Sequence, residues 1–128
     1  MAQHNTLGLA GEEAAARYLM FRNYSIRERN WRCGRLEIDI IAERYGLLVF
    51  VEVKSRRNEA YGSPAEAVDR QKMLHTLTAA NAYIRLHRLV MPVRFDIVAV
   101  IGEQPPFRIE HIRDAFRPGL PDIHPAES

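Results

Sequence analysis

Two neighbouring segments of the chain alternate apolar and charged residues, and this alternation restricts the fold more than any other feature of the sequence. The segments are residues 36–40 (LEIDI) and 49–54 (VFVEVK). Successive side chains of a strand point to opposite faces of its sheet, so the pattern predicts two half-buried β-strands. The apolar residues between the charges, Ile38, Val51 and Val53, are expected to face the core.

The charged side chains of these two strands are predicted to gather on one side. Residues 45–46 (Tyr-Gly) lie in the polar break between the strands and indicate a two-residue hairpin turn. An antiparallel hairpin with that turn would place Asp39 opposite Glu52 and Glu37 opposite Lys54. Opposed carboxylates repel each other unless a cation lies between them, and Mg²⁺ is a hard ion that one or two carboxylates can hold. The alternative is a solvated polar face with a structural role only.

Lysine is rare in this chain, which makes its positions informative. Of the 18 basic residues, only Lys54 and Lys72 are lysines and the rest are arginines. A compact ammonium group can orient or deprotonate a water, whereas an arginine stays protonated. Lys54 is therefore a candidate catalytic residue, and a composition that simply favours arginine is the alternative explanation.

Length and composition limit the class of protein. The 128 residues, 47% of them hydrophobic, fit one domain with its own core. We expect this domain to span residues 1–117 and residues 118–128 to form a mobile tail. The single cysteine, Cys33, excludes an internal disulfide and a cysteine-rich zinc site and suits a reducing cytoplasm. Neither a secretion signal nor a bilayer-spanning apolar run is visible, so a soluble cytoplasmic protein without a membrane partner is expected.

Basic residues are unevenly distributed around the two acidic strands. The net charge of +2 is too small to predict nucleic-acid binding by itself. Local clusters beside a carboxylate site could nevertheless hold a phosphate backbone. An edge strand protected by arginines is the structural alternative. The candidates for phosphate contact on the strands are Arg27, Arg29, Arg56 and Arg57.

The first helix is predicted over residues 7–22, and it carries an acid on its apolar side. Glu12 falls on the same side as Ala15, Ala16 and Leu19 at helical spacing. A buried carboxylate needs a cation, a metal or a hydrogen-bond donor. Alternatively, Glu12 only complements the helix dipole at the edge of the core.

The remaining pattern predicts an α/β protein with a central mixed sheet flanked by helices. Residues 62–66 combine an N-cap serine, a proline and a capping-box glutamate, so a second helix should begin there and run to about residue 88. Asp96 has Arg94 on its own strand face, which favours a structural ion pair. Further strands are expected over residues 24–31, 93–101 and 107–112, which gives the order α-β-β-β-α-β-β.

Several of these residues together resemble a known superfamily. Glu12, Asp39 and the triplet Glu52-Val53-Lys54, on a helix and two strands, resemble the PD-(D/E)XK nucleases. More specifically, the chain looks like the uncharacterised bacterial YraN-like family, which is regarded as endonuclease-like and similar to archaeal Holliday junction resolvases. The residues that carry this resemblance are Gly11-Glu12, Ala15, Tyr18-Leu19, Arg29-Asn30, Glu37-Ile38-Asp39, residues 50–56, residues 62–68 and Arg94-Phe95-Asp96. One departure is Leu36, where the family usually has glycine.

The resemblance implies a restriction-endonuclease-like fold and a metal-dependent endonuclease acting on phosphodiester bonds of branched or structured DNA. It implies that Asp39 and Glu52 ligate Mg²⁺ or Mn²⁺, with the Val53 carbonyl as a further ligand. Lys54 would assist the attacking water, and Glu12 would complete the metal site. Gln71 and Lys72 are weaker candidates for positioning the nucleic acid. Resolvase-like chemistry would call for a homodimer, and a non-catalytic nucleic-acid-binding protein on the same fold is the alternative.

Overall fold

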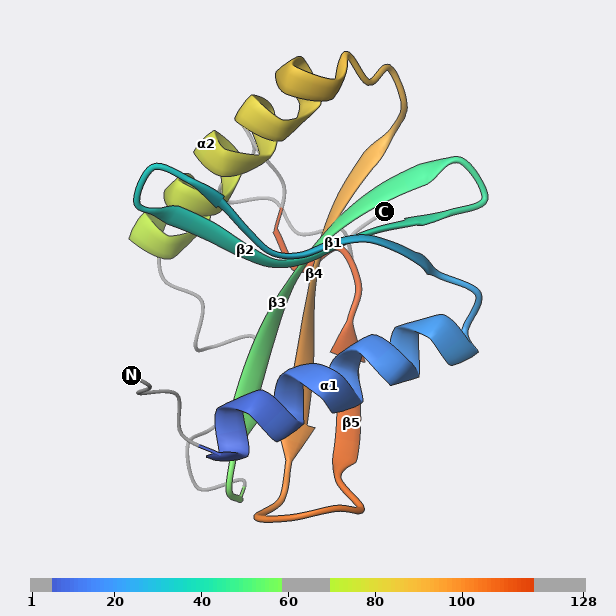
Figure 1. Cartoon of the computed structure of the whole chain (residues 1–128), viewed down its shortest axis with the longest axis vertical. Helices are drawn as coiled ribbons and strands as arrows, with labels where there is room; N and C mark the ends of the chain where they lie inside the picture. Colours follow the sequence, from blue (N-terminus) through green and yellow to red (C-terminus); the bar gives the residue numbers. More distant parts are fainter. Residues whose placement is uncertain (1–5, 59–69, 117–128) are drawn as a thin grey trace.

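The computed structural model describes residues 6–58 and 70–116 and contains two helices and five strands in that part of the chain (Figure 1). The predicted order of elements is confirmed, and the bounds differ by few residues wherever both ends are described. The predicted start of the second helix at 62–66 and the tail at 118–128 lie outside the described residues. The elements are α1 (Thr6–Phe21), β1 (Ser25–Cys33), β2 (Leu36–Arg44), β3 (Leu47–Arg56), α2 (Arg70–His87), β4 (Val93–Ile101) and β5 (Arg108–Ile112).

The five strands form one mixed sheet in the order β1-β2-β3-β4-β5. Strands β3 and β4 are parallel, and the other neighbours are antiparallel. The connection between the parallel strands contains α2, as a crossover in an α/β protein requires. The predicted α/β class with a mixed sheet is therefore confirmed. Neither described helix is both long and apolar enough to cross a membrane.

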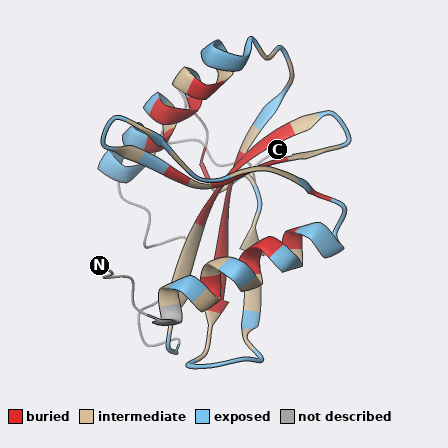
Figure 2. Cartoon of the chain, in the orientation of Figure 1, coloured by how far each residue is buried: buried red, intermediate tan, exposed pale blue. Residues whose placement is uncertain are grey.

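The two helices cover opposite faces of the sheet, and each face has its own apolar core (Figures 1 and 2). On one face, Leu19 of α1 packs with Val49 and Val51 of β3. On the other, Tyr83 of α2 packs with Phe50 of β3. Since alternate residues of β3 supply the two cores, its middle is buried on both sides. This explains why its sequence is almost continuously apolar before the first charge.

The predicted hairpin turn between β2 and β3 is confirmed. Tyr45 and Gly46 have φ angles of 50° and 80°, and positive φ at both positions of a two-residue loop is typical of a type I′ turn. The predicted register holds from the turn to the pair Ile40–Val51.

The strand pairing stops at that pair, one position before the two acids. The predicted backbone pairs of Asp39 with Glu52 and of Glu37 with Lys54 are therefore not part of the ladder. Strand β2 leaves β3 here and continues beside β1 alone (Figure 1). In a regular ladder the backbone of β2 would contact β3 at this position. Here the side chain of Asp39 makes the contact with β3.

The expectation that Ile38, Val51 and Val53 face the core is confirmed, but they pack in two cores on opposite faces of the sheet. Ile38 packs in the core under α2, whereas Val51, Val53 and Ile40 pack in the core under α1. Ile38 and Ile40 thus lie on opposite faces, although regular alternation would put them together. The change of face coincides with the departure of β2 from β3. Asp39 lies between these two isoleucines, at the point of crossing.

Candidate active site

Asp39 occupies the gap that opens where β2 and β3 separate. Its Oδ2 accepts a hydrogen bond of 2.8 Å from the backbone N–H of Val53. A buried backbone N–H needs a partner, and the ladder with β2 no longer supplies one at this position. The carboxylate side chain therefore replaces the missing strand contact and is fixed against β3.

The surroundings of Asp39 disfavour its negative charge. Burial is the main cause and, despite the opposing hydrogen bond from Val53, the pKa of Asp39 is raised from 3.8 to about 6. The negative charges of Glu52 and Glu12 raise this pKa further, and the positive charge of Lys72 lowers it. Glu52 of β3 and Glu12 of α1 are thus close enough to Asp39 of β2 for their charges to act on it. Asp39 is therefore a carboxylate whose ionised form is disfavoured, mainly because the group is buried.

Glu52 is a buried carboxylate with two cationic partners. It is 8% exposed, and its Oε2 lies 3.0 Å from Nζ of Lys54 and 3.4 Å from Nζ of Lys72. These are the two lysines of the whole sequence. Lys54 comes from the same face of β3 as Glu52, as predicted, and Lys72 comes from the first turn of α2. The sequence predicts Lys72 only as a candidate for positioning the nucleic acid, and no local pattern indicates its contact with Glu52.

Glu12 reaches the site because α1 packs very closely on β3. A Cβ atom built on Gly11 would overlap the Oγ of Ser55, so this position tolerates no side chain without movement. Glu12 itself is half-buried, while the next residues on its side, Ala15 and Ala16, are fully buried. The predicted inward-facing side of the helix is thus correct, and Glu12 lies at its edge, where its charge acts on Asp39.

The donor atoms present fit a hard divalent cation. Within residues 6–58 and 70–116, no group of three or more Asp, Glu, His or Cys side chains has the arrangement of a metal site. Mg²⁺ needs only one or two carboxylates, because it keeps several of its waters. Asp39 and Glu52 supply two carboxylates, and Val53, which follows Glu52 in the sequence and donates its N–H to Asp39, supplies a carbonyl as a third oxygen. A divalent ion there would also relieve the unfavourable negative charge at Asp39.

Comparison with known proteins assigns the chain to a protein family. The model of the uncharacterised protein family UPF0102 matches residues 11–100. The chain belongs to this family. It is 53% identical over 120 residues to a UPF0102 protein of Bacteroides thetaiotaomicron, covering 94% of this chain and 99% of that one. It is 44% identical over 116 residues to a UPF0102 protein of Flavobacterium psychrophilum, covering 91% and 98%. The YraN-like resemblance is thereby confirmed.

The UPF0102 match encloses all four candidate site residues. It begins at Gly11, directly before Glu12, and extends beyond Asp39, Glu52 and Lys54 to the end of β4.

The candidate phosphate-binding residues of this UPF0102 chain differ in availability. Arg27 donates hydrogen bonds to Glu43 at 3.0 Å and to the Tyr83 hydroxyl at 2.9 Å. Arg29 forms an ion pair of 3.1 Å with Glu13. Both would have to exchange an existing partner for a phosphate. Arg56 is half-buried and donates to the carbonyl oxygen of Ser55. Arg57 and Gln71 are exposed. Lys72 is exposed as well, but it is already paired with Glu52 at 3.4 Å.

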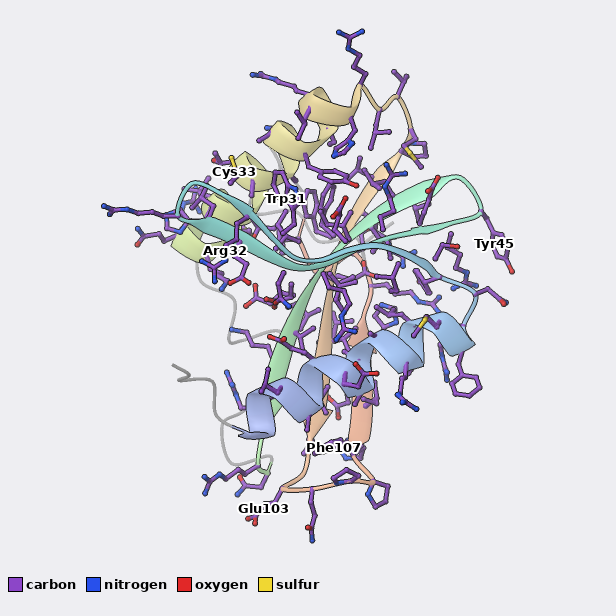
Figure 3. All side chains as sticks on the ribbon, in the orientation of Figure 1. Trp31, Arg32, Cys33, Tyr45, Glu103 and Phe107 are labelled. Carbon is purple, nitrogen blue, oxygen red and sulfur yellow. The ribbon has the colours of Figure 1, made fainter. Side chains whose placement is uncertain are left out.

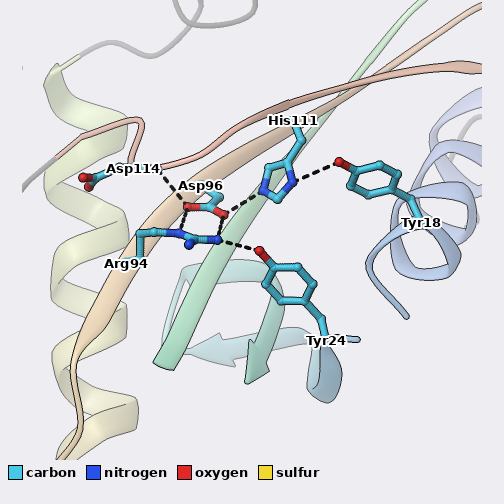
Figure 4. A network of polar contacts seen from close by, with 6 residues as sticks. All are labelled: Tyr18, Tyr24, Arg94, Asp96, His111 and Asp114. Atoms are coloured by element: carbon cyan, nitrogen blue, oxygen red, sulfur yellow. Dashed lines mark hydrogen bonds and ion pairs between the residues drawn. The ribbon is translucent and has the colours of Figure 1, made fainter. Parts of the chain in front are cut away.

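A second polar cluster surrounds Asp96 and is only partly visible in the sequence (Figure 4). The predicted ion pair is confirmed, because Arg94 donates to both carboxylate oxygens at 2.8 and 2.7 Å. Asp96 Oδ2 also lies 2.7 Å from Nε2 of His111, and Oδ1 accepts the backbone N–H of Asp114 at 3.0 Å. Burial opposes ionisation, yet the hydrogen bonds from His111, Arg94 and Asp114 hold the pKa of Asp96 below its ordinary value.

The Asp96 cluster connects distant parts of the UPF0102 fold. His111 Nδ1 lies 3.1 Å from the hydroxyl of Tyr18 on α1, and Arg94 donates to the hydroxyl of Tyr24 at 2.6 Å. Since the side chains of Asp96 and His111 are 0% and 4% exposed, neither is accessible to a substrate. The cluster shares no residue with the acidic site. We interpret it as a structural network that joins α1, β4 and β5.

Proposed function

We propose that this chain is a metal-dependent endonuclease of the PD-(D/E)XK, restriction-endonuclease-like kind, which hydrolyses phosphodiester bonds in branched or structured DNA. The observation that carries the proposal is the grouping of Asp39, Glu52 and Lys54 where β2 leaves β3, with Glu12 added from α1. A mixed sheet with helices on both faces is compatible with that fold class. The resemblance to the YraN-like family also supports an endonuclease.

Asp39, Glu52 and the Val53 carbonyl would hold Mg²⁺ or Mn²⁺. When bound, such an ion supplies a Lewis acid and lowers the pKa of a coordinated water. Glu12 of α1 adds a negative charge that acts on Asp39 and would support the same cation. A role in holding a metal would account for the position of Asp39, because burial there raises its pKa and a bound cation would favour its ionised form.

The lysines would act on the water and on the phosphate. Nζ of Lys54 lies 3.0 Å from Glu52, where it can donate a hydrogen bond to an attacking water or to a phosphate oxygen. Its side chain is only 17% exposed, whereas that of Lys72 is 49% exposed. Lys54 is therefore the group that orients the water, and Lys72 adds positive charge on the solvent side as negative charge develops on the phosphate.

The test is a cleavage assay on branched, nicked, single-stranded and duplex DNA with Mg²⁺ or Mn²⁺. We expect cleavage by the wild type and none by Asp39→Asn or Lys54→Ala. The matched control is Glu37→Gln, because Glu37 is an exposed acid two positions from Asp39 on the same strand. Among the described residues its ion-pair partner is Arg32, at 4.0 Å. Cleavage that survives Asp39→Asn would remove the basis of the proposal.

A non-catalytic nucleic-acid-binding protein is the second candidate. It is favoured by the ion pair that already neutralises Lys54 and by the lack of a three-residue ligand cluster among the described residues. It predicts DNA binding that weakens steeply with salt, no cleavage of any substrate in the panel, and no loss of affinity in Lys54→Ala. Paired cleavage of a two-fold-symmetric junction would require a homodimer, which sedimentation of the protein with and without DNA would detect.

A further inference from the structure

A basic pocket lies beside the β2–β3 turn, at the end of β2 that is far from the β1–β2 turn. It has a volume of about 270 Å³ and is lined by Arg44, Tyr45, Leu47, Arg94 and Arg113. These residues come from the β2–β3 turn, the start of β4 and the segment after β5. Figure 3 shows Tyr45 at this turn, far from Arg32 and Cys33 at the β1–β2 end. Arg44 is five positions from Asp39 along β2, a separation of about 17 Å at the usual strand rise.

The pocket carries more positive charge than the described residues compensate. Arg94 is neutralised by Asp96 through two hydrogen bonds. Arg44 and Arg113 form no ion pair with any carboxylate within residues 6–58 and 70–116. Two arginine side chains therefore line one pocket without a carboxylate partner among the described residues. Like charges held together in this way are costly to the folded state, and a bound anion would remove that cost.

Two of the three guanidinium groups are already held in place. The Arg44 guanidinium lies 4.9 Å from the ring centroid of Tyr24 and 5.1 Å from that of Tyr45. Arg94 is fixed by Asp96 and by the hydroxyl of Tyr24. Groups that are oriented before binding lose little conformational freedom when a ligand arrives. The planar donor fork of arginine also matches the oxygens of a phosphate.

The rim of the pocket presents an aromatic ring. Tyr45 is 81% exposed, and the positive φ angles of the tight turn hold it there. Exposed aromatic rings beside cationic groups are the platforms on which proteins stack nucleic-acid bases. The pocket thus combines phosphate donors with a stacking surface.

We propose that this pocket binds the terminal phosphate of a nucleotide, with the adjoining base or sugar against Tyr45. A terminal phosphate carries about −1.5 to −2 charge at neutral pH, which matches the two uncompensated arginines better than the single charge of a backbone phosphodiester. The end of a nucleic-acid strand and a free nucleotide present the same group. The pocket shares no residue with the acidic site and needs no metal, so this inference goes beyond the proposed nuclease activity.

The test measures binding to the full chain in EDTA, where no cleavage can contribute. Fluorescence anisotropy compares a short thymidine oligonucleotide that carries a 5′-phosphate, a 3′-phosphate or hydroxyl groups at both ends, with thymidine 5′-monophosphate as competitor. We expect one phosphorylated form to bind about tenfold more tightly than the unphosphorylated one, the effect of one added charge-assisted hydrogen-bonding group. Arg113→Gln and Arg44→Gln should bring that ratio close to one.

The matched control is Arg35→Gln, which removes an exposed arginine from the β1–β2 turn at the opposite end of β2. It should leave the ratio unchanged even where it lowers overall affinity. Arg113 is exposed, so Arg113→Gln is expected to fold. If Arg44→Gln does not fold, Arg113→Gln alone tests the phosphate preference.

Each outcome has a defined meaning. Competition by thymidine 5′-monophosphate that depends on Arg113 identifies a free nucleotide as the ligand, whereas a phosphate preference without competition identifies a strand end. Equal affinity for all three oligonucleotides together with no competition overturns the proposal. So does a phosphate preference that both pocket variants retain. Because cleavage is not measured, these results are independent of the fate of the proposed nuclease.

Discussion

Replacement of Asp39 by asparagine should make the metal-free protein more stable at neutral pH. The amide oxygen can still accept the hydrogen bond from Val53, while the charge that its surroundings disfavour is removed. A pKa of about 6 in place of 3.8 corresponds to about 3 kcal/mol, at about 1.4 kcal/mol for each tenfold change in proton affinity. We expect Asp39→Asn to raise the free energy of unfolding by about 2 to 3 kcal/mol.

The sign of the pH dependence follows from the raised pKa. The folded protein binds this proton more tightly than the unfolded chain, so wild-type stability falls as the pH rises from about 4 to about 6. Well below pH 4 the wild-type carboxyl is neutral in both states, and the advantage of asparagine should vanish. Urea unfolding in EDTA at acidic and neutral pH measures the difference, and Glu37→Gln should show neither the gain nor this pH dependence.

Addition of metal extends the same experiment. Mg²⁺ or Mn²⁺ binding to the folded state alone should raise the unfolding midpoint of the wild type and leave that of Asp39→Asn unchanged. The reasoning is refuted when Asp39→Asn is less stable than the wild type at neutral pH in EDTA. It is equally refuted when the stability difference between the two proteins is the same at acidic and neutral pH.

The other predictions concern packing, the Asp96 cluster and the lysines. Gly11→Ala should destabilise the fold by about 1 to 3 kcal/mol through overpacking, and Ser55→Ala in the same chain should recover part of this in urea unfolding. Asp96→Asn should cost about 3 to 5 kcal/mol because it leaves buried charges unpaired. Since the pKa of Asp96 is lowered by folding, that difference should be present above about pH 4 and shrink below it. In single-turnover cleavage, Lys54→Ala should lower the rate by about 10² to 10⁴-fold, and Lys72→Ala should lower it less.

Local sequence patterns predicted the parts of the fold that depend on near neighbours. The β2–β3 turn follows from Tyr45 and Gly46, and the register follows from the turn as far as Ile40. The Arg94–Asp96 pair was predictable because the two side chains are two positions apart on one strand. In each case the deciding contact lies within a few residues of the pattern that predicts it.

Contacts between distant segments were not predictable in this way. Strand β2 separates from β3 next to Asp39, where Ile38 packs in the core under α2 and Ile40 packs in the core under α1. No local pattern marks His111 as a partner of Asp96. The contact of Lys72 with Glu52 likewise depends on where α2 crosses the sheet, which the spacing along the chain does not determine.

The two lysines at Glu52 have a consequence for how the protein would respond to its supply of metal. They act as built-in counterions, so the acidic residue at the centre of the site is neutralised before any ion arrives. Small domains that depend on zinc unfold when the metal is withdrawn, but this chain carries its own substitute charge. When magnesium is scarce, the proposed activity would therefore be lost while the protein stays folded, and the activity would return when the ion binds again.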